Sequence, residues 1–287
     1  MHHIRIVTDS TADLSPEQVK KYSITVVPIT VSFGDESFAD GVDLTAEDFY
    51  KRLTSSSVLP KTSQPSPEAF RQVYEKLASK DETILSIHVS GKLSGTLNSA
   101  ELASKMVTSK VVPIDSKTAS QGIGRSVLIA AEAAKRNMAL DDILAVVSKS
   151  VAQTFSVFAV DTLEFLQRNG RIGKAASLLG TALQIRPILF ANPEGMVAPY
   201  DKVRGRSQVI PSLVAAALKN VSADKPVNLS VVHSGAVDSA QNLLEKLNKE
   251  YDVADLHVGM VGPAIGAHIG PGAVGLMIQP SFEMLLQ

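Results

Sequence analysis

Short runs of β-branched and aliphatic residues alternate with segments of helical spacing along the first half of the chain. The runs that predict strands are Ile4–Thr8, Ile24–Val31, Ile84–Val89 and Val111–Ile114. The segments that predict helices are Pro16–Tyr22, Ala46–Leu53, Pro67–Ser79, Leu97–Val107, Gln121–Asn137 and Leu140–Thr154. Ser15 and Ser66 are placed to cap the helices that open at Pro16 and Pro67. Regular alternation of this kind is typical of parallel α/β layering.

The pattern changes near residue 153. Beyond it we expect a hairpin with an Asn-Pro-Glu-Gly turn, formed by Pro187–Ala191 and Met196–Val203. We then expect a strand, a helix, a strand, a glycine-rich loop and a final strand, at Val227–Val232, Ala236–Tyr251, Asp255–Val261, 262–272 and Ala273–Ile278. These elements predict two α/β domains, residues 1–153 and 154–287. Because no low-complexity linker separates them, we expect the two to share an interface.

Composition removes several classes of function. The chain has 28 basic and 29 acidic residues among 287, a net charge of −1, and therefore no electrostatic basis for non-specific binding to nucleic acid. It has no cysteine, which excludes thiolate nucleophiles, disulfides and cysteine-based metal sites. Hydrophobic residues make up 45% of the chain but aromatic ones only 5%. The apolar content is thus almost wholly aliphatic, suited to a core or to a slot for an aliphatic ligand.

Motifs for common catalytic sites are missing. The third glycine of a dinucleotide-binding loop is replaced by Val127, and Gly173-Lys174-Ala175 lacks the hydroxyl of a phosphate-binding loop. No H-E-x-x-H occurs, so we expect no metal and no cofactor. No apolar run approaches the roughly 20 residues that a membrane span needs. With Asp9 falling where a signal peptide would still be apolar, we expect a cytoplasmic protein.

The segment from Ser90 to Thr96 is the most informative of those that could bind a ligand. It follows the predicted strand Ile84–Val89 and opens a helix, so its N–H groups and the hydroxyls of Ser94 and Thr96 face the crevice at the end of that strand. Free N–H groups at such a position suit a carboxylate or a phosphate. Simple capping of the helix by Ser94 or Thr96 explains the same residues equally well.

Two further segments have the same two interpretations. The prolines after Thr62 and Ser63 favour an extended backbone that leaves both hydroxyls free, although a plain helix-entry loop also fits. Asp9, after the first strand, is either a catalytic carboxylate or, more commonly, the acceptor of an Asx turn.

The second half offers one histidine and two arginines. His268 lies among glycines that allow a ligand to approach the backbone, where an imidazole can donate a hydrogen bond to a carboxylate or transfer a proton. Arg171 and Arg204 lie at predicted turns and could bind carboxylate or phosphate oxygens in bidentate fashion. A surface ion pair is the more common fate of an arginine.

Seven motifs follow one another along nearly the whole chain: Thr8-Asp9-Ser10, Thr62-Ser63-Gln64-Pro65-Ser66, Leu93-Ser94-Gly95-Thr96, Asp115-Ser116, Leu163 with Gly170-Arg171-Ile172-Gly173, Lys202 with Arg204-Gly205, and Gly266-Ala267-His268-Ile269-Gly270-Pro271-Gly272. In this order the set closely resembles the DegV family. The chain departs from the pattern at Asn169, where many members have the first glycine of a pair.

The resemblance implies a two-domain DegV-type α/β fold. Its N-terminal domain would be mostly parallel, its C-terminal domain would have a mixed sheet, and one long-chain fatty acid would bind between them. Thr62 and Ser94 would hydrogen-bond the carboxylate, with His268 close by. The supporting or partner-facing residues would be Ser63, Gly95, Thr96, Arg171 and Arg204.

By the same resemblance the protein would be a carrier with no catalytic residue of its own. Arg204 would lie near the opening at which a separate bacterial fatty acid kinase converts the bound acid to an acyl phosphate. Exchange of the lipid would involve transient membrane contact. The competing hypothesis is an enzyme: a hydrolase or acyl transferase using Ser94 with His268, or a phosphotransferase using Asp9. The missing nucleophile elbow and phosphate loop disfavour that alternative.

Overall fold

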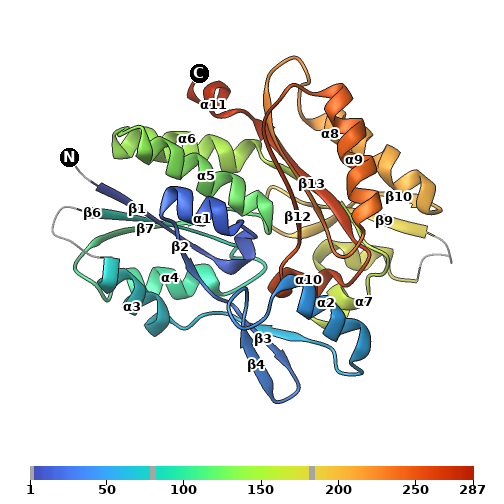
Figure 1. Cartoon of the computed structure of the whole chain (residues 1–287), viewed down its shortest axis with the longest axis horizontal. Helices are drawn as coiled ribbons and strands as arrows, with labels where there is room; N and C mark the ends of the chain where they lie inside the picture. The colour runs from blue at the N-terminus through green and yellow to red at the C-terminus, as the bar shows by residue number, and fades with distance from the viewer. Residues whose placement is uncertain (1–2, 78–81, 181–184) are drawn as a thin grey trace.

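Two β-sheets lie side by side and divide the chain into an early and a late half (Figure 1). The computed structural model describes residues 3–77, 82–180 and 185–287. The first sheet is wholly parallel, with the strand order β2-β1-β6-β7. Its strands are β1 (His3–Asp9), β2 (Thr25–Val27), β6 (Glu82–His88) and β7 (Lys110–Asp115).

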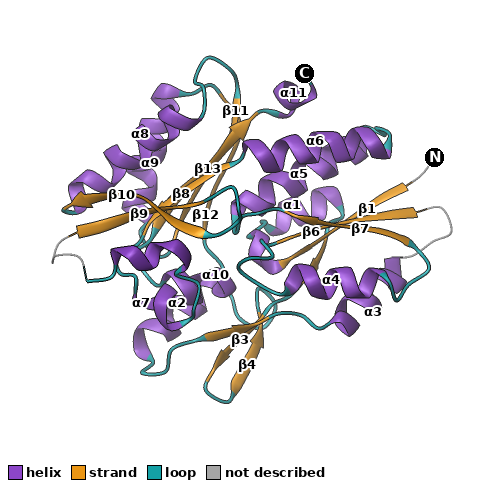
Figure 2. Ribbon diagram, turned by 180° about the vertical axis from the view of Figure 1, so that it is seen from behind, coloured by secondary structure: helices purple, strands orange, loops and turns teal. Residues whose placement is uncertain are grey.

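Helices cover both faces of the parallel sheet (Figure 2). One face carries α1 (Pro16–Tyr22), α5 (Gln121–Lys135) and α6 (Leu140–Gln153), and the other carries α3 (Pro67–Leu77) and α4 (Thr96–Ser104). The Ser15 hydroxyl accepts from the backbone N–H of Gln18 in a capping box, and Ser66 accepts from Ala69. Both predicted caps are therefore confirmed. The predicted end of the third helix, at Ser79, lies outside the described residues.

The second sheet is mixed and has the strand order β10-β9-β8-β13-β11-β12, in which only β11 and β12 run parallel. Its strands are β8 (Phe155–Ala159), β9 (Ile185–Ala191), β10 (Val197–Arg204), β11 (Val227–His233), β12 (Val253–Met260) and β13 (Val274–Pro280). One face packs on α8 (Val209–Asn220) and α9 (Val237–Glu250). The α/β class and the mixed second sheet are as expected. The boundary at residue 153 falls between α6 and β8, and the division into two domains stays a prediction.

A small third sheet joins the two halves. It consists of β4 (Glu36–Ala39), β3 (Thr30–Phe33) and β5 (Lys61–Ser63), and it packs with α2 (Ala46–Ser55) against α10 (Pro263–Ile269). The single strand predicted over Ile24–Val31 is wrong, because the chain leaves the parallel sheet after Val27 and enters this third sheet at Thr30. Pro28, which has no N–H to donate to a ladder, lies between the two strands.

Helix α5 lies between the two large sheets and contacts both of them. Its Arg125 is only 1% exposed and reaches the second sheet, donating to the Ser230 hydroxyl (2.7 Å), to the Leu229 carbonyl (2.5 Å) and to Asp255. A buried guanidinium with all its partners in the other half ties the halves together. The expected shared interface is thus present.

The late half contains elements that the sequence pattern did not predict. Helix α8 was missed, and residues 262–272, expected to be a loop, contain α10. The other short elements of this half are α7 (Glu164–Arg168), η2 (Gly173–Leu178), η3 (Arg206–Gln208) and α11 (Phe282–Leu286), and the early half has η1 (Ser10–Ala12). The predicted hairpin is confirmed as β9 and β10, with Asn192 accepting from the backbone N–H of Glu194 and Met196 in the turn.

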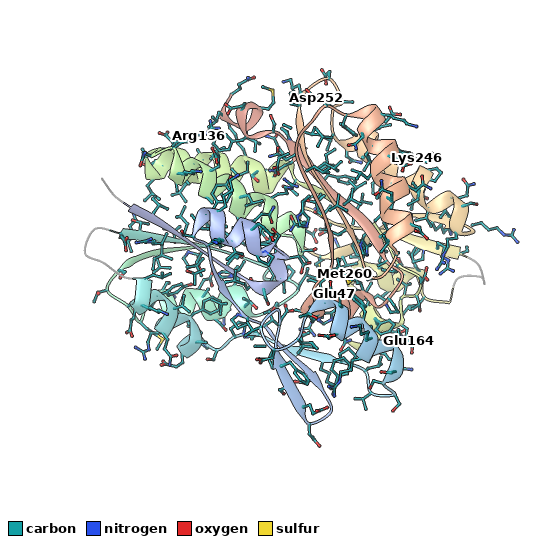
Figure 3. The ribbon with its side chains drawn as sticks, in the orientation of Figure 1. Glu47, Arg136, Glu164, Lys246, Asp252 and Met260 are labelled. Carbon is teal, nitrogen blue, oxygen red and sulfur yellow. The ribbon has the colours of Figure 1, made fainter. Side chains whose placement is uncertain are left out.

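Charge is spread around the outside of the molecule. Glu47, Arg136, Glu164, Lys246 and Asp252 lie on or next to different elements and are all exposed (Figure 3). Within the described residues no helix is both long and apolar enough to span a membrane.

Candidate functional site

A cavity of about 400 Å³ opens between the two halves of the molecule. The early half contributes the residues that follow β1, β6 and β7, and the late half contributes the inner face of the mixed sheet together with α10. This volume lies within the range of roughly 300–1,000 Å³ that is usual for small-molecule sites. A ligand in this cavity would contact both sheets at once.

The wall of the cavity is mainly apolar and buried, and its exposed residues are polar. Nine apolar lining residues are each at most 5% exposed: Ile29, Val89, Leu166, Val232, Val261, Ala264, Ala273, Val274 and Met277. The polar lining residues Thr62, Ser94, Arg171 and His268 are half-buried, and Ser63 and Gln64 are exposed. The cavity is therefore shaped for a molecule with an aliphatic body and one polar end near the surface.

Thr62 and His268, which lie 206 positions apart in the sequence, meet at the polar end. Thr62 lies on β5 and His268 on α10, and Thr62 Oγ1 is 2.8 Å from His268 Nε2. His268 Nδ1 is buried and has no hydrogen-bond partner among the described residues. Burial, and secondarily the nearby Arg171, lower the pKa of His268 to about 4. The imidazole is thus neutral at pH 7, with one buried nitrogen still unpartnered.

The loop before α4 brings Ser94 to the cavity. Ser94 Oγ lies 2.9 Å from Thr96 Oγ1 and accepts from the Thr96 backbone N–H (3.3 Å), so Ser94 both lines the cavity and hydrogen-bonds the first residue of the helix. Gly95 leaves room for the end of the Gln64 side chain, whose oxygen would lie 2.1 Å from a Cβ at this position. The absence of that atom lets Gln64 lie across the helix start and reach Ser99 (3.3 Å).

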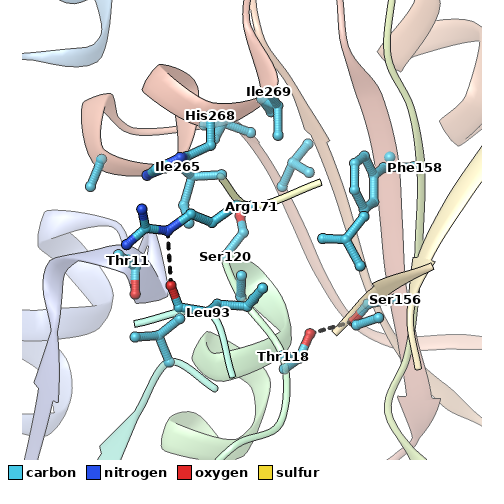
Figure 4. Close-up of a pocket in the computed structure, with 18 of the residues that line it drawn as sticks. Thr11, Leu93, Thr118, Ser120, Ser156, Phe158, Arg171, Ile265, His268 and Ile269 are labelled. Atoms are coloured by element: carbon cyan, nitrogen blue, oxygen red, sulfur yellow. Dashed lines mark hydrogen bonds between the residues drawn. The ribbon is translucent and has the colours of Figure 1, made fainter. Parts of the chain in front are cut away.

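Arg171 extends across the cavity toward the early half (Figure 4). Its Nε donates to the Leu93 carbonyl (3.1 Å) and its Nη1 to the Asn169 carbonyl (2.8 Å). No carboxylate within the described ranges forms an ion pair with it. The Asn169 side chain in turn donates to the Ala267 carbonyl on α10 (2.9 Å). A guanidinium beside the neutral imidazole, with no acidic partner, suits an incoming anion.

The structure brings together most of the predicted site residues. Thr62, Ser63, Ser94, Arg171 and His268 all line the cavity. Gly95 and Thr96 support the wall without lining it. Arg204, at the exposed end of β10, does not line the cavity, and its proposed contact with a partner protein stays a prediction.

Sequence reasoning missed the polar residues deep in the cavity. Thr118 donates to Ser156 (3.0 Å) across the boundary between the halves, and Ser120 lies nearby at the start of α5 (Figure 4). Phe158 lines the cavity from β8. No spacing or motif marks these positions, because they come from separate elements that only tertiary packing brings together.

A serine, a histidine and an aspartate form a hydrogen-bonded row behind the residues that line the cavity. Ser86 Oγ lies 2.7 Å from His88 Nε2, and His88 Nδ1 lies 2.9 Å from Asp9 Oδ2. All three side chains are 0% exposed, and the Tyr74 hydroxyl lies 2.9 Å from Ser86 Oγ. Asp9 also accepts from the backbone N–H of Thr11 and of Val89, so it has the acceptor role that the sequence favoured. The row has the order of a catalytic triad but no access for a substrate.

The alternative pair, Ser94 and His268, is not joined by a hydrogen bond. Ser94 is bonded to Thr96, and His268 to Thr62. A serine nucleophile needs its base within hydrogen-bond reach. No group of three or more His, Asp or Glu side chains within the described part of the chain could hold a metal ion.

Comparison with known proteins identifies relatives of this architecture. A family model described as "Uncharacterised protein, DegV family" matches residues 3–281. A DegV domain-containing protein of Streptomyces coelicolor is 36% identical over 282 residues, covering 96% of this chain and 98% of that protein. Protein DegV of Bacillus subtilis is 31% identical over 276 residues, with coverage of 96% and 98%.

Solved structures agree with the sequence matches. A DegV family protein of Thermus thermophilus, described as binding fatty acid, superposes with a TM-score of 0.92 at 34% identity, covering 97% of this chain and all of that one. DegV of Bacillus subtilis, described as a fatty acid binding protein, gives a TM-score of 0.90 at 30% identity, covering 98% and 100%. The agreement of model, relatives and fold over nearly the whole length leaves one conclusion: this chain belongs to the DegV family.

Proposed function

We propose that this protein binds one long-chain fatty acid, with the acyl chain in the apolar part of the cavity and the carboxylate at its polar end. The observation that carries the proposal is the make-up of the cavity wall, in which buried aliphatic residues predominate while Thr62, Ser94, Arg171 and His268 are partly accessible. The fatty acid binding described for the DegV family proteins of Thermus thermophilus and Bacillus subtilis supports it.

The acyl chain supplies most of the affinity. About 15 methylene groups, at about 0.8 kcal/mol each, give a gross gain on the order of 12 kcal/mol before the costs of ordering the ligand. The cavity wall needs no special chemistry for this, only aliphatic side chains that exclude water. The composition of the chain, rich in aliphatic and poor in aromatic residues, agrees with such a wall.

The polar end selects an acid over an ester or an alcohol. A carboxylate placed there accepts hydrogen bonds from the hydroxyls of Thr62 and Ser94. It is also bonded by His268 and attracted by the positive charge of Arg171. An uncharged head group would leave buried donors unmatched, at about 1–3 kcal/mol each. Binding of an anion raises the pKa of His268 from its value of about 4, because the carboxylate favours the imidazolium.

The bound acid is then a substrate for a separate fatty acid kinase that makes the acyl phosphate. The accessibility of Ser63 and Gln64 at the polar end supports this, because the carboxylate and not the tail would be nearest to a partner. The chain has no phosphate-binding loop of its own. Arg204, exposed at the end of β10, is the proposed partner contact, and we place the reaction in the cytoplasm.

The identity of the co-purified lipid tests the binding step. Protein purified from a lipid-containing host is denatured and its organic extract analysed by mass spectrometry. We expect about one fatty acid per chain. Extracts that repeatedly contain no acid, together with no binding of added hexadecanoate in titration calorimetry, would refute the proposal.

The kinase step is tested separately with Arg204→Ala. This variant should bind hexadecanoate as the native protein does, because Arg204 does not line the cavity. Acyl phosphate formation by a fatty acid kinase from the same cell should be slower with the variant. Equal rates for both proteins would remove Arg204 from the partner surface. Acyl ester hydrolysis that disappears in Ser94→Ala would instead favour the hydrolase hypothesis.

A further inference from the structure

Asp13 does not line the cavity, but it hydrogen-bonds residues of both halves next to it. It follows η1, its Oδ2 lies 2.5 Å from the Ser120 hydroxyl oxygen, and its Oδ1 accepts from the backbone N–H of Gly262 (3.0 Å). Ser120 precedes α5 and Gly262 precedes α10. The Gln121 side chain also donates to the backbone carbonyl of Asp13. One carboxylate thus connects the first turn of a helix from each half of the molecule.

The backbone at this connection is strained. Asp13 has a φ of 50° and Ser120 a φ of 53°, both in the left-handed region that non-glycine residues seldom adopt. Such conformations persist when the surroundings hold them in place, and they are concentrated at functional sites. Here the two strained residues are hydrogen-bonded to each other.

A second carboxylate and a phenol lie beside Asp13. Asp40 is 4% exposed and its Oδ2 has no hydrogen-bond partner among the described residues; the same is true of the Tyr50 hydroxyl, which packs against Gly266 of α10. Burial, and then the charges of Asp40 and Asp9, raise the pKa of Asp13 to about 8. Burial, and then Asp9, raise the pKa of Asp40 to about 6. Within the described part of the chain no basic side chain pairs with either carboxylate.

Helix α10 is the element that this cluster holds. Ala264, facing Asp40 through its backbone N–H, lines the cavity, as do Ile265, His268 and Ile269 further along the helix. We propose that Asp13, with Asp40 beside it, is a positioning residue of the carboxylate-binding end: it fixes α10 against the start of α5 and so sets His268 opposite Thr62. The carboxylate in question is the ligand of the proposed function, on which this inference rests.

The connection depends on pH, because ionising two neighbouring carboxylates that have no cation beside them costs free energy. At neutral pH Asp13 keeps its proton on Oδ2 and donates it to the Ser120 oxygen, so the connection is uncharged. Above about pH 8 it ionises beside Asp40 and Asp9, and repulsion acts on the first turn of α10. Tyr50 does not ionise in this range, since burial and then Asp13 and Asp40 raise its pKa further. Asp13 therefore makes the position of His268 depend on pH, although His268 itself titrates near pH 4.

The first experiment needs no ligand. The ring ¹⁵N and ¹H signals of His268, assigned by comparison with His268→Gln, are followed by NMR from pH 6 to 9.5. We expect an inflection near pH 8 in the native protein and none in Asp13→Asn, because the amide accepts from Gly262, donates to Ser120 and cannot ionise. Asp35→Asn, an exposed carboxylate, is the matched control and should keep the inflection.

The second experiment measures the hexadecanoate Kd over the same pH range. In the native protein Kd should rise roughly fivefold above pH 8, the equivalent of one ordinary hydrogen bond, and in Asp13→Asn it should stay level. Asp13→Ala should bind weakly throughout. If Asp13→Ala does not fold, the Asp13→Asn variant still tests whether Kd depends on the ionisation of Asp13.

The outcomes separate this inference from the proposed function. An inflection that persists in Asp13→Asn, or none in the native protein, overturns the positioning role whatever the protein binds. An Asp13-dependent inflection without any hexadecanoate binding supports the positioning of His268 and refutes fatty acid binding. A change in unfolding temperature alone, with His268 signals and Kd unaffected, would show Asp13 to be purely structural.

Discussion

Two histidines in this protein sit in contrasting settings. His88 is 0% exposed, and both its ring nitrogens have partners, Ser86 on one side and Asp9 on the other. His268 borders the cavity, shares one nitrogen with Thr62 and leaves the other unpartnered. The arrangement that looks more like a catalytic triad is the one that no substrate can reach.

The contrast is the reason why we propose His268, which has access to the cavity and an unmet hydrogen bond, and not the triad-like His88, as the ligand-binding histidine. Phe70 packs edge-on against the His88 ring, with ring centroids 5.0 Å apart, and closes the row off. A fully satisfied buried network stabilises one packing of the core. The unpartnered nitrogen of His268, by comparison, lies near the Arg171 guanidinium and can still form a hydrogen bond.

The largest expected effect is on stability, from His88→Ala. The variant leaves Asp9 buried without its histidine and Ser86 without its acceptor, which should lower the free energy of unfolding by about 3–5 kcal/mol. Urea unfolding followed by circular dichroism measures the loss. The folded protein should still bind hexadecanoate. A stable His88→Ala variant that no longer binds would place His88 in the site and break the contrast.

His268→Gln should have the opposite signature. Loss of a hydrogen bond to a charged group, worth about 1.5–3 kcal/mol, should raise the Kd for hexadecanoate roughly 10- to 150-fold. Unfolding free energy should change little at pH 7, because the native imidazole is neutral and half unpartnered. Calorimetric titration and urea unfolding of the same preparation give both numbers. Unaltered affinity would remove His268 from the partners of the head group.

The pH dependence of His268 follows from its lowered pKa. Its folded value, about 4, is below the ordinary 6.5, so between these values the unfolded chain binds more protons. The contribution of His268 to stability is therefore complete above pH 6.5 and is lost as the pH falls toward 4. A bound carboxylate raises the folded pKa, so hexadecanoate binding at pH 6 should take up protons. Calorimetry in buffers of different ionisation enthalpy should detect the uptake in the native protein and not in His268→Gln.

The smallest effects distinguish the two serines. Ser94→Ala should weaken hexadecanoate binding roughly fivefold, as one neutral hydrogen bond implies, with little change in stability. Ser86→Ala should cost about 1–3 kcal/mol of stability, since it leaves the Tyr74 hydroxyl and His88 unpartnered, with Kd unchanged. The same two assays serve both variants. Exchanged results would mean that the roles of the two serines are reversed.

The sequence predicted a large part of this arrangement. Local rules sufficed for the caps at Ser15 and Ser66, the turn at Asn192 and the acceptor role of Asp9, because each depends on residues a few positions apart. Helix α10 was missed because its glycines and proline are typical of loops. Its Pro263 lies within the first turn, where a missing N–H costs nothing, and the Cβ-free Gly266 lets α2 approach closely.

The sequence by itself determined the α/β class, the aliphatic interior, the absence of cysteine chemistry and the short motifs at strand ends. Tertiary structure alone decided which of these motifs meet. Thr62 and His268 are brought together by a third sheet that the hydrophobic pattern did not reveal. Asp13 hydrogen-bonds both Ser120, 107 positions away, and Gly262, 249 positions away. Periodicity reports which side of an element is buried but not what it is buried against, so contacts between distant segments appear only when the chain is folded.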